Sequence, residues 1–158
     1  NFPSWTGGLS FSVRYKNFDL SGLFQGAFDV DGYFTAEAAY AFYNGATALK
    51  RHLDRWTPEN HDATYPRITR TDQTNFTTSS FWLQDASYVR LKNLTLGYTM
   101  PKAWMTKLGV ANAKVFLSGE NLFTITGLDG GIDPEEADER GWSYGNVKKI
   151  SVGVRLSF

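Results

Sequence analysis

Strict alternation of apolar and polar residues marks the end of the chain. Residues 150–158 read ISVGVRLSF, with an apolar side chain at every even position and Ser, Gly or Arg at every odd position. A period of two is typical of a β-strand whose two faces meet different surroundings. Such a strand can lie over a soluble core or cross a membrane. The pattern of the other predicted strands is needed to distinguish these two possibilities.

Two alternating segments near the start predict a hairpin. Residues 9–15 (LSFSVRY) carry their apolar side chains at odd positions, and residues 18–28 (FDLSGLFQGAF) carry Phe, Leu and Gly at even positions. The polar pair at 16–17 between them has the length of a tight turn. The next segment, 33–44, is open to two interpretations, an extension of the hairpin or the start of a loop, because its alanines suit a helix as well.

Extended character returns in two later segments. Residues 88–100 (YVRLKNLTLGYTM) change register, since the apolar positions are odd in the first half and even in the second. A β-bulge near Lys92 and Asn93 would produce that change. Alternatively, the upper half of this strand projects above a membrane and needs no lipid-facing side. Residues 113–124 (AKVFLSGENLFT) complete a set of five predicted strands.

The connections between the strands alternate in length. Outer-membrane barrels show such an order, with short periplasmic turns and long external loops, and it places the C-terminus in the periplasm. Within the connections, we expect a short helix at 46–56 and another helical piece at 103–109. The connections run short (16–17), long (29–87), short (101–112) and long (125–147).

Composition narrows the class of protein. Lys plus Arg and Asp plus Glu both number 16, so the formal net charge is zero and no basic surface is predicted for nucleic acid. Aromatic residues make up 16% of the chain, which favours strands. No cysteine is present, which removes disulfides and thiolate metal sites. No apolar run is long enough for a membrane-spanning helix, and the mean hydropathy of −0.34 is compatible with a barrel.

Several longer strings resemble one known family. They occur in the order seen at the C-terminal end of SusC/RagA-like TonB-linked outer-membrane proteins, and the resemblance covers nearly the whole chain. It implies an all-β fold, a transmembrane antiparallel β-barrel: the last five or so strands of a plugged barrel of about 22 strands, with long external loops. The strings are WTGGLSFSVRYKNFDLSGLFQG, DRWTPEN followed by YPR, FWLQDASYVRLKNLTLGYTMP, KVFLSGENLFT, the DPE at 133–135 and the final strand.

The resemblance also implies a function, partners and a location. It implies a TonB-dependent importer of glycans or peptides in the outer membrane of a Gram-negative bacterium. The implied partners are the remainder of the same barrel and its plug domain, a SusD-like surface lipoprotein, the TonB complex, outer-membrane lipid and the barrel assembly machinery. The start at NFPSW, without Met or a leader, predicts that residues 1–158 are a C-terminal part of a barrel domain that lacks its plug. The implied assembly signal is Ser151, Gly153, Leu156 and Phe158.

Candidate ligand-binding residues are aromatic or charged. Trp56, Trp82 and Trp142 lie in or beside the long loops and would stack on sugar rings above the pore; the alternative is an upper aromatic girdle or packing between loops. Asp85 either binds ligand or ties down the base of a loop. Arg90 and Glu120 lie within strands, where a lumen-facing side chain touches substrate or plug, or forms a solvated wall.

No enzyme chemistry is predicted. The loops carry many carboxylates, but a glycosidase would need two of them to face each other across a sugar, and a calcium loop would need regular ligand spacing. We favour a solvated external loop over ion binding, and ion binding over catalysis. His52 and His61 lack the pattern of a metal site, and no nucleophile motif or phosphate-binding loop is present. We therefore expect a solvated loop surface without metal or cofactor. The carboxylates are Glu59, Asp62, Asp129, Asp133, Glu135, Glu136, Asp138 and Glu139.

Three hypotheses for the function follow. The leading one is a segment of the wall and external loops of an energised importer. The second is a non-transporting structural or docking segment, in which residues 44–87 and 125–147 present loops to a surface lipoprotein. The third is a soluble β-sandwich that binds carbohydrate through its tryptophans. A requirement for detergent separates the third from the others, because a barrel exposes an apolar band about 25 Å tall.

Overall fold

A computed structural model describes residues 2–70, 74–128, 131–136 and 140–158. The chain divides into two compact units. We call the first the loop unit; it consists of Asn1–Ser4, Phe28–Ser87 and Thr126–Gly145. We call the second the strand unit; it consists of Trp5–Ala27, Tyr88–Ile125 and Asn146–Phe158.

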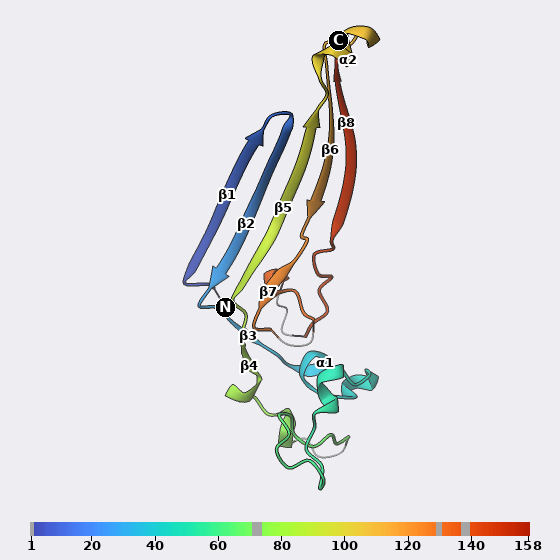
Figure 1. Ribbon diagram of the computed structural model, residues 1–158. Coiled ribbons are helices and arrows are strands. Elements are labelled where there is room, and N and C mark those ends of the chain that lie inside the picture. The colour runs from blue at the N-terminus through green and yellow to red at the C-terminus, as the bar shows by residue number, and fades with distance from the viewer. Residues whose placement is uncertain (1, 71–73, 129–130, 137–139) are drawn as a thin grey trace. The chain divides into compact units, whose positions relative to one another are not determined.

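The strand unit contains one antiparallel sheet. Five long strands lie side by side in the order β1, β2, β5, β6, β8, and the short β7 (Thr124–Thr126) pairs with β5 (Figure 1). The five predicted strands are therefore confirmed. The helical piece predicted between two of them is α2 (Lys102–Leu108), which ends at Gly109 with a left-handed φ of 67°. The long strands are β1 (Trp5–Tyr15), β2 (Phe18–Phe28), β5 (Tyr88–Thr99), β6 (Asn112–Glu120) and β8 (Lys149–Ser157).

The register change predicted in β5 is a β-bulge. Leu23 of β2 lies opposite Asn93. The next residue, Phe24, lies opposite Leu91, so the ladder between the two strands skips Lys92. The extra residue brings the odd-numbered apolar side chains before the bulge onto the same face as the even-numbered ones after it.

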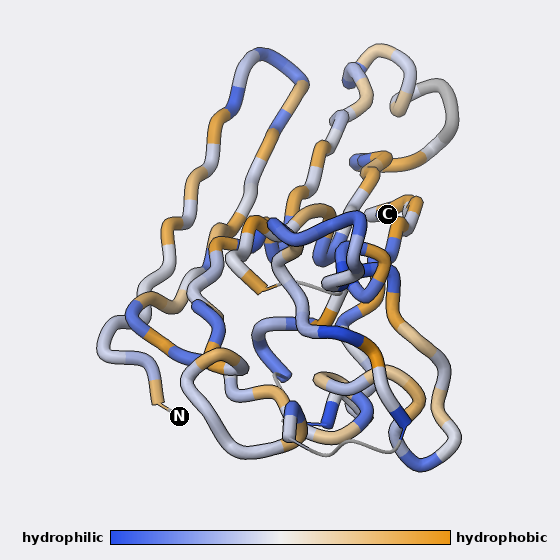
Figure 2. The backbone as a smooth tube through the Cα atoms, turned by 90° about the horizontal axis from the view of Figure 1, so that it is seen from below, coloured by the Kyte–Doolittle hydropathy of each residue, from blue (hydrophilic) through white to orange (hydrophobic). Residues whose placement is uncertain are grey.

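The strand registers separate apolar from polar side chains. Val154 of β8 pairs with Val115 of β6, and Val115 pairs with Tyr98 of β5. Tyr98 in turn pairs with Phe18 of β2. Cross-strand partners share a face, so one apolar face continues across these strands. Figure 2 shows the matching alternation of hydrophobic and hydrophilic positions along the backbone. The apolar face also carries Leu20, Phe24, Leu94, Leu96, Leu117, Ile150, Val152 and Leu156, and the opposite face carries Asp19, Ser21, Gln25, Asn93, Thr95, Lys114, Ser118, Ser151 and Arg155.

One aromatic residue departs from this separation for a local reason. Phe116 lies on the polar face, directly opposite Gly153 of β8. Its ring covers that glycine, and a β-carbon at residue 153 would overlap the ring. The same arrangement occurs on the apolar face, where a β-carbon at Gly22 would overlap the ring of Phe11. In both places an aromatic side chain shields the bare backbone of the neighbouring strand.

The loop unit has little regular structure. β3 (Asp31–Tyr33) and β4 (Leu83–Asp85) form a two-stranded antiparallel sheet, and α1 (Ala36–Ala39) is a short helix. The ambiguous segment 33–44 therefore completes a strand and then forms a helix. Throughout the described ranges, no helix combines the length and the apolar character needed to cross a membrane. The remaining turns are 3-10 helices at Tyr43–Gly45, Lys50–Leu53, Thr74–Phe76, Ser80–Trp82 and Pro134–Glu136.

The helix predicted at 46–56 is wrong in both length and type. Only Lys50–Leu53 is helical, and it is a 3-10 turn. Beyond it the chain pairs with a later segment: the Tyr65 N–H donates to the Asp54 carbonyl at 3.1 Å, and the Trp56 N–H donates to the Tyr65 carbonyl at 2.8 Å. The backbone groups that a longer helix would need are committed to this pairing.

An aromatic core holds the loop unit together. The ring centroid of Tyr40 lies 4.6 Å from that of Phe76 and 5.2 Å from that of Trp82. Phe34 is completely buried in the same core, and Leu128 joins it from the second long connection. The two connections predicted as separate loops therefore share one hydrophobic core.

Candidate functional site

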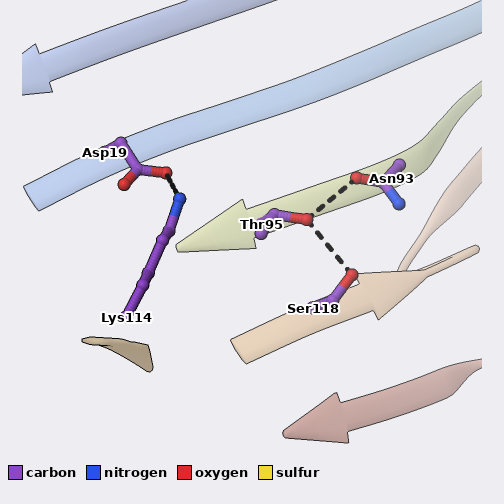
Figure 3. Close-up of polar contacts among 5 residues, drawn as sticks. All are labelled: Asp19, Asn93, Thr95, Lys114 and Ser118. Carbon is purple, nitrogen blue, oxygen red and sulfur yellow. Dashed lines mark hydrogen bonds and ion pairs between the residues drawn. The ribbon is translucent and has the colours of Figure 1, made fainter. Parts of the chain in front are cut away.

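The polar face of the strand unit is held together by contacts across three strands, as Figure 3 shows. Lys114 of β6 forms an ion pair with Asp19 of β2, with 2.7 Å between Nζ and Oδ2. The pair spans β5 at Gly97, where a β-carbon would overlap both side chains. The Thr95 hydroxyl also hydrogen-bonds the Ser118 hydroxyl at 3.1 Å. The polar groups of these four residues therefore already have partners on this face.

Arg90 and Glu120 both make contacts between strands. Arg90 is 2% exposed, and its Nε donates a hydrogen bond to Thr124 Oγ1 at 2.8 Å. Its guanidinium also lies 5.8 Å from the centre of the Tyr88 ring. Glu120 faces Lys149 across β6 and β8, with 3.7 Å between carboxylate and ammonium. Both residues belong to the wall of the sheet, and their contact with substrate stays a prediction.

The predicted tryptophans lie in the loop unit but do not form one site. Trp82 is 4% exposed and belongs to the aromatic core. Trp56 is exposed and stacks on His61, with ring centroids 5.7 Å apart. Trp56 and Trp82 line one open cavity of about 550 Å³ together with Phe81. Trp142 lines a different cavity, so the structure brings together two of the three.

Trp142 belongs to a second set of contacts. The Arg140 guanidinium lies 4.2 Å from the centre of the Trp142 ring. Arg140 also donates to both carboxylate oxygens of Glu37, with nitrogen–oxygen distances between 3.0 and 3.1 Å. Burial alone would raise the pKa of Glu37, but hydrogen bonds from its own backbone N–H and from Arg140 outweigh that effect and hold the pKa below its ordinary 4.5. At neutral pH this ion pair ties the second long connection to α1.

Asp85 closes the base of the first long connection. Its Oδ1 accepts a hydrogen bond from the Ser87 N–H at 2.8 Å, and Ser87 Oγ accepts one from the Asp29 N–H at 3.1 Å. Hydrogen bonds from the side chain and backbone of Ser87 hold the pKa of Asp85 below its ordinary 3.8. This geometry fits the loop-base interpretation of Asp85, and a contact with ligand stays a prediction.

The four residues of the predicted assembly signal lie on or just beyond β8. Ser151 and Gly153 lie on the polar face, and Leu156 lies on the apolar face. Phe158 follows the strand, and its ring is 90% exposed. The alternation of the last strand fixes their directions, and their role in assembly stays a prediction.

The buried histidine of the loop unit serves the fold. Its Nδ1 accepts a hydrogen bond from the Leu49 N–H at 2.9 Å, and its Nε2 lies 3.0 Å from the Ala39 carbonyl oxygen. Burial lowers the pKa of this residue, His52, below its ordinary 6.5. Among the described residues, no three His, Cys, Asp or Glu side chains form a group that could hold a metal ion. The candidate carboxylates Asp129, Asp138 and Glu139 lie outside the described residues.

Two basic residues of the loop unit were absent from the predicted sites. Arg51 is buried with its guanidinium 5.5 Å from the centre of the Phe34 ring, and its three side-chain nitrogens have no hydrogen-bond partner within the described part of the chain. Arg70 lines an open cavity beside α1. Both positions depend on contacts between distant segments, so no periodic pattern in the sequence could have indicated them.

Comparisons with known proteins define the family. No family model matches the chain. The chain is 30% identical over 171 residues to TonB-dependent receptor P3 of Formosa agariphila, an alignment that covers 99% of this chain and 16% of that receptor. It is 32% identical over 169 residues to TonB-dependent receptor P26 of the same organism, covering 99% and 17%.

Solved structures agree with these relatives. The chain matches a chain of the RagAB peptide transporter with a TM-score of 0.76 at 28% identity, covering 99% of this chain and 17% of that one. It matches the RagAB peptide importer in the open-open state with a TM-score of 0.73 at 30% identity, with the same coverage. These are likenesses to a small part of much longer chains.

The fold and the two-faced sheet define this molecule as a segment of an outer-membrane β-barrel. The chain belongs to the TonB-dependent receptor family and spans 16 to 17% of the length of the relatives named above. The resemblance and the fold class predicted from the sequence are confirmed, which removes the soluble β-sandwich from the hypotheses. The relatives are receptors and importers, not enzymes.

Proposed function

We propose that the chain supplies part of the wall and the external loops of an energised importer of oligomeric nutrients. One observation carries the proposal: a sheet with one apolar and one polar face occurs in the same chain as two long connections that share a core. Such a sheet suits a wall between lipid and a polar lumen. A shared core gives the connections enough fixed structure to hold a ligand. The likeness to the RagAB peptide importer supports peptides over glycans as cargo.

The open edges of the sheet support a larger barrel. β1 and β8 are the two ends of the strand order. In hydrocarbon, unpaired N–H and C=O groups along an edge are costly, so further strands have to pair with both. We therefore propose that residues 1–158 are the C-terminal part of a barrel whose remaining strands and plug come from the same protein. The small share of the relatives' length that the chain spans supports this.

We infer the orientation from the connection lengths. Residues 44–87 and 125–147 face the outside, where a SusD-like lipoprotein would dock, and the turns at 16–17 and 101–112 face the periplasm together with the C-terminus. Protease added to intact cells is expected to cut only within the long connections. Cleavage at Lys102 without permeabilising the outer membrane would reverse the assignment.

The importer proposal is tested with the full-length protein and its lipoprotein in cells. Uptake of a labelled peptide pool is expected to stop when TonB coupling is removed, while the barrel remains in the membrane and still binds the pool. Uptake that continues without TonB, or steady ion conduction by the purified protein in bilayers, would contradict an energised, plugged importer. If the lipoprotein co-purifies but no cargo is taken up with TonB present, the chain belongs to a docking segment instead.

A further inference from the structure

An open cavity of about 720 Å³ lies beside α1 in the loop unit. It differs from the cavity of Trp56 and Trp82, with which it shares no described lining residue. Three separate parts of the sequence contribute to its wall, which is why no local motif indicates it. The described lining residues are Thr35, Ala36, Tyr40, Ala41, Phe42, Tyr43, Asn44, Thr69, Arg70, Phe76, Thr78 and Arg140.

Aromatic side chains in mutual contact form one part of the wall. Tyr40, Tyr43 and Phe76 form a cluster with centroid distances between 4.6 and 6.1 Å. The Tyr40 hydroxyl donates a hydrogen bond to the Phe76 carbonyl at 3.1 Å, which fixes that ring in place. Aromatic faces held in this way can pack against the apolar parts of a ligand. Hydroxyl and amide groups of threonines and Asn44 supply hydrogen bonds elsewhere on the wall.

The cavity has an excess of positive charge. Arg140 is already neutralised by the bidentate ion pair with Glu37. Arg70 is exposed and makes no hydrogen bond or ion pair with any residue that the structure describes; its guanidinium lies 5.8 Å from the centre of the Phe42 ring. No Asp or Glu occurs among the described lining residues. Arg70 is therefore a cation that an anionic ligand can reach.

The backbone around the cavity is strained. Ala36, Phe42 and Asn44 have left-handed φ values of 49°, 62° and 48°. All three residues line the cavity. A non-glycine residue in this conformation is strained and persists where the surroundings enforce it, often at binding sites. At Phe42 the unusual backbone presents the ring to the guanidinium of Arg70.

We propose that this cavity binds a carboxylate of an acidic oligomer, with Arg70 as the recognition residue. A guanidinium fork matches both oxygens of a carboxylate, and the stacked ring of Phe42 keeps the fork oriented toward the ligand. The tyrosine and phenylalanine faces pack against the carbon skeleton next to the carboxylate. This inference rests on the proposed importer function and adds the chemical class of the cargo.

The test uses the full-length protein purified in detergent. Two acidic probes, tetraglutamate and trigalacturonate, are compared by calorimetry with two uncharged probes: tetraglutamine that is N-acetylated and C-amidated, and trigalactose. Arg70→Gln is expected to weaken binding of an acidic probe about ten- to hundredfold, because a hydrogen bond to a charged group is lost. The uncharged probes should bind Arg70→Gln and the unchanged protein alike. Lys50→Gln is the control, since it removes one exposed positive charge in the loop unit outside the cavity.

The outcomes separate this inference from the importer proposal. Binding of tetraglutamate alone, or of trigalacturonate alone, with dependence on Arg70 supports the inference and identifies the source of the carboxylate as peptide or sugar. Absence of binding by both acidic probes, or an equal effect of Arg70→Gln and Lys50→Gln, overturns it. Neither result depends on TonB. Conversely, uptake that continues without TonB would overturn the importer proposal. It would not change the measured binding of the acidic probes or its dependence on Arg70.

Discussion

Replacing Val154 by arginine tests which face of the sheet meets lipid. β8 has nine residues, Lys149–Ser157, and Val154 is next to its central residue, Gly153. At about 3.3 Å per residue and a tilt near 45°, Val154 lies only about 2–3 Å from the middle of the strand along the membrane normal. An arginine facing lipid at this depth costs about 2–4 kcal/mol. That cost corresponds to a decrease of roughly 30- to 900-fold in the folding equilibrium constant.

The surroundings of Val154 offer the new charge no partner. The cross-strand neighbour is Val115, and none of the described residues on the apolar face is acidic. The matched control is Ser151→Arg on the same strand. Its neighbour across β6 is Ser118 on the polar face, so the control is expected to cost less than about 1 kcal/mol unless the arginine meets the plug.

The comparison requires the full-length protein folded into lipid vesicles. Urea titrations of both variants and of the unchanged protein give the free energy of unfolding, and the difference in gel migration between the unheated and the heat-unfolded protein reports the folded fraction. Val154→Arg alone should show the large loss. Equal losses in the two variants, or a larger loss for Ser151→Arg, would show that the even-numbered side chains of β8 do not face lipid.

Three further predictions address the chain end and the loop unit. Deletion of Phe158 is expected to leave the protein synthesised but poorly inserted; a normal amount of heat-resistant barrel in the outer membrane would refute its role as an anchor or assembly signal. The pKa of His52 lies below 6.5 in the folded loop unit, so His52 is protonated at a higher pH in the unfolded state than in the folded state. The stability of the loop unit should therefore fall as the pH drops below 6.5. Proteolysis of the loops should therefore accelerate several-fold from about pH 7.5 to 5.5 in the unchanged protein and in His61→Asn, but not in His52→Gln. Arg51→Met removes a buried guanidinium without a hydrogen-bond partner in the described chain and should stabilise the loop unit by about 1–3 kcal/mol, seen as slower proteolysis; faster cleavage would contradict this.

The strand unit could be predicted because its pattern is local. Alternation with period two determines which side chains share a face. Both halves of β5 pair with β2, so its change of register requires one residue to be skipped in the ladder. One exception is Phe116, whose place on the polar face follows from a glycine on the neighbouring strand. Which glycine lies opposite which ring depends on the register between strands, and that cannot be read from one strand alone.

The loop unit could not be predicted in the same way because its contacts join distant segments. Glu37 and Arg140 are 103 positions apart, and no spacing rule connects them. The position of Trp82 in a polar loop left sugar stacking and packing between loops both open, and the structure places it against Tyr40 in the core. Arg70 was not among the predicted sites, and only the fold places it at a cavity. For such sites the composition of a loop indicates little until its packing is known.

The two units differ in what stabilises them. We therefore expect assembly into the membrane to depend on the strand unit and ligand binding to depend on the loop unit. The loop unit buries Phe34, Tyr40 and Trp82 as a water-soluble domain would. The strand unit leaves apolar side chains such as Val13 and Val152 largely exposed, so its stability has to come from backbone pairing at both edges and from contact with lipid. Changes of lipid or of neighbouring strands therefore act on the strand unit, whereas changes of pH or ligand act on the loop unit. The same barrel wall can therefore support loops that bind different ligands. A substitution such as Arg70→Gln is expected to alter ligand binding without altering the conditions under which the sheet folds.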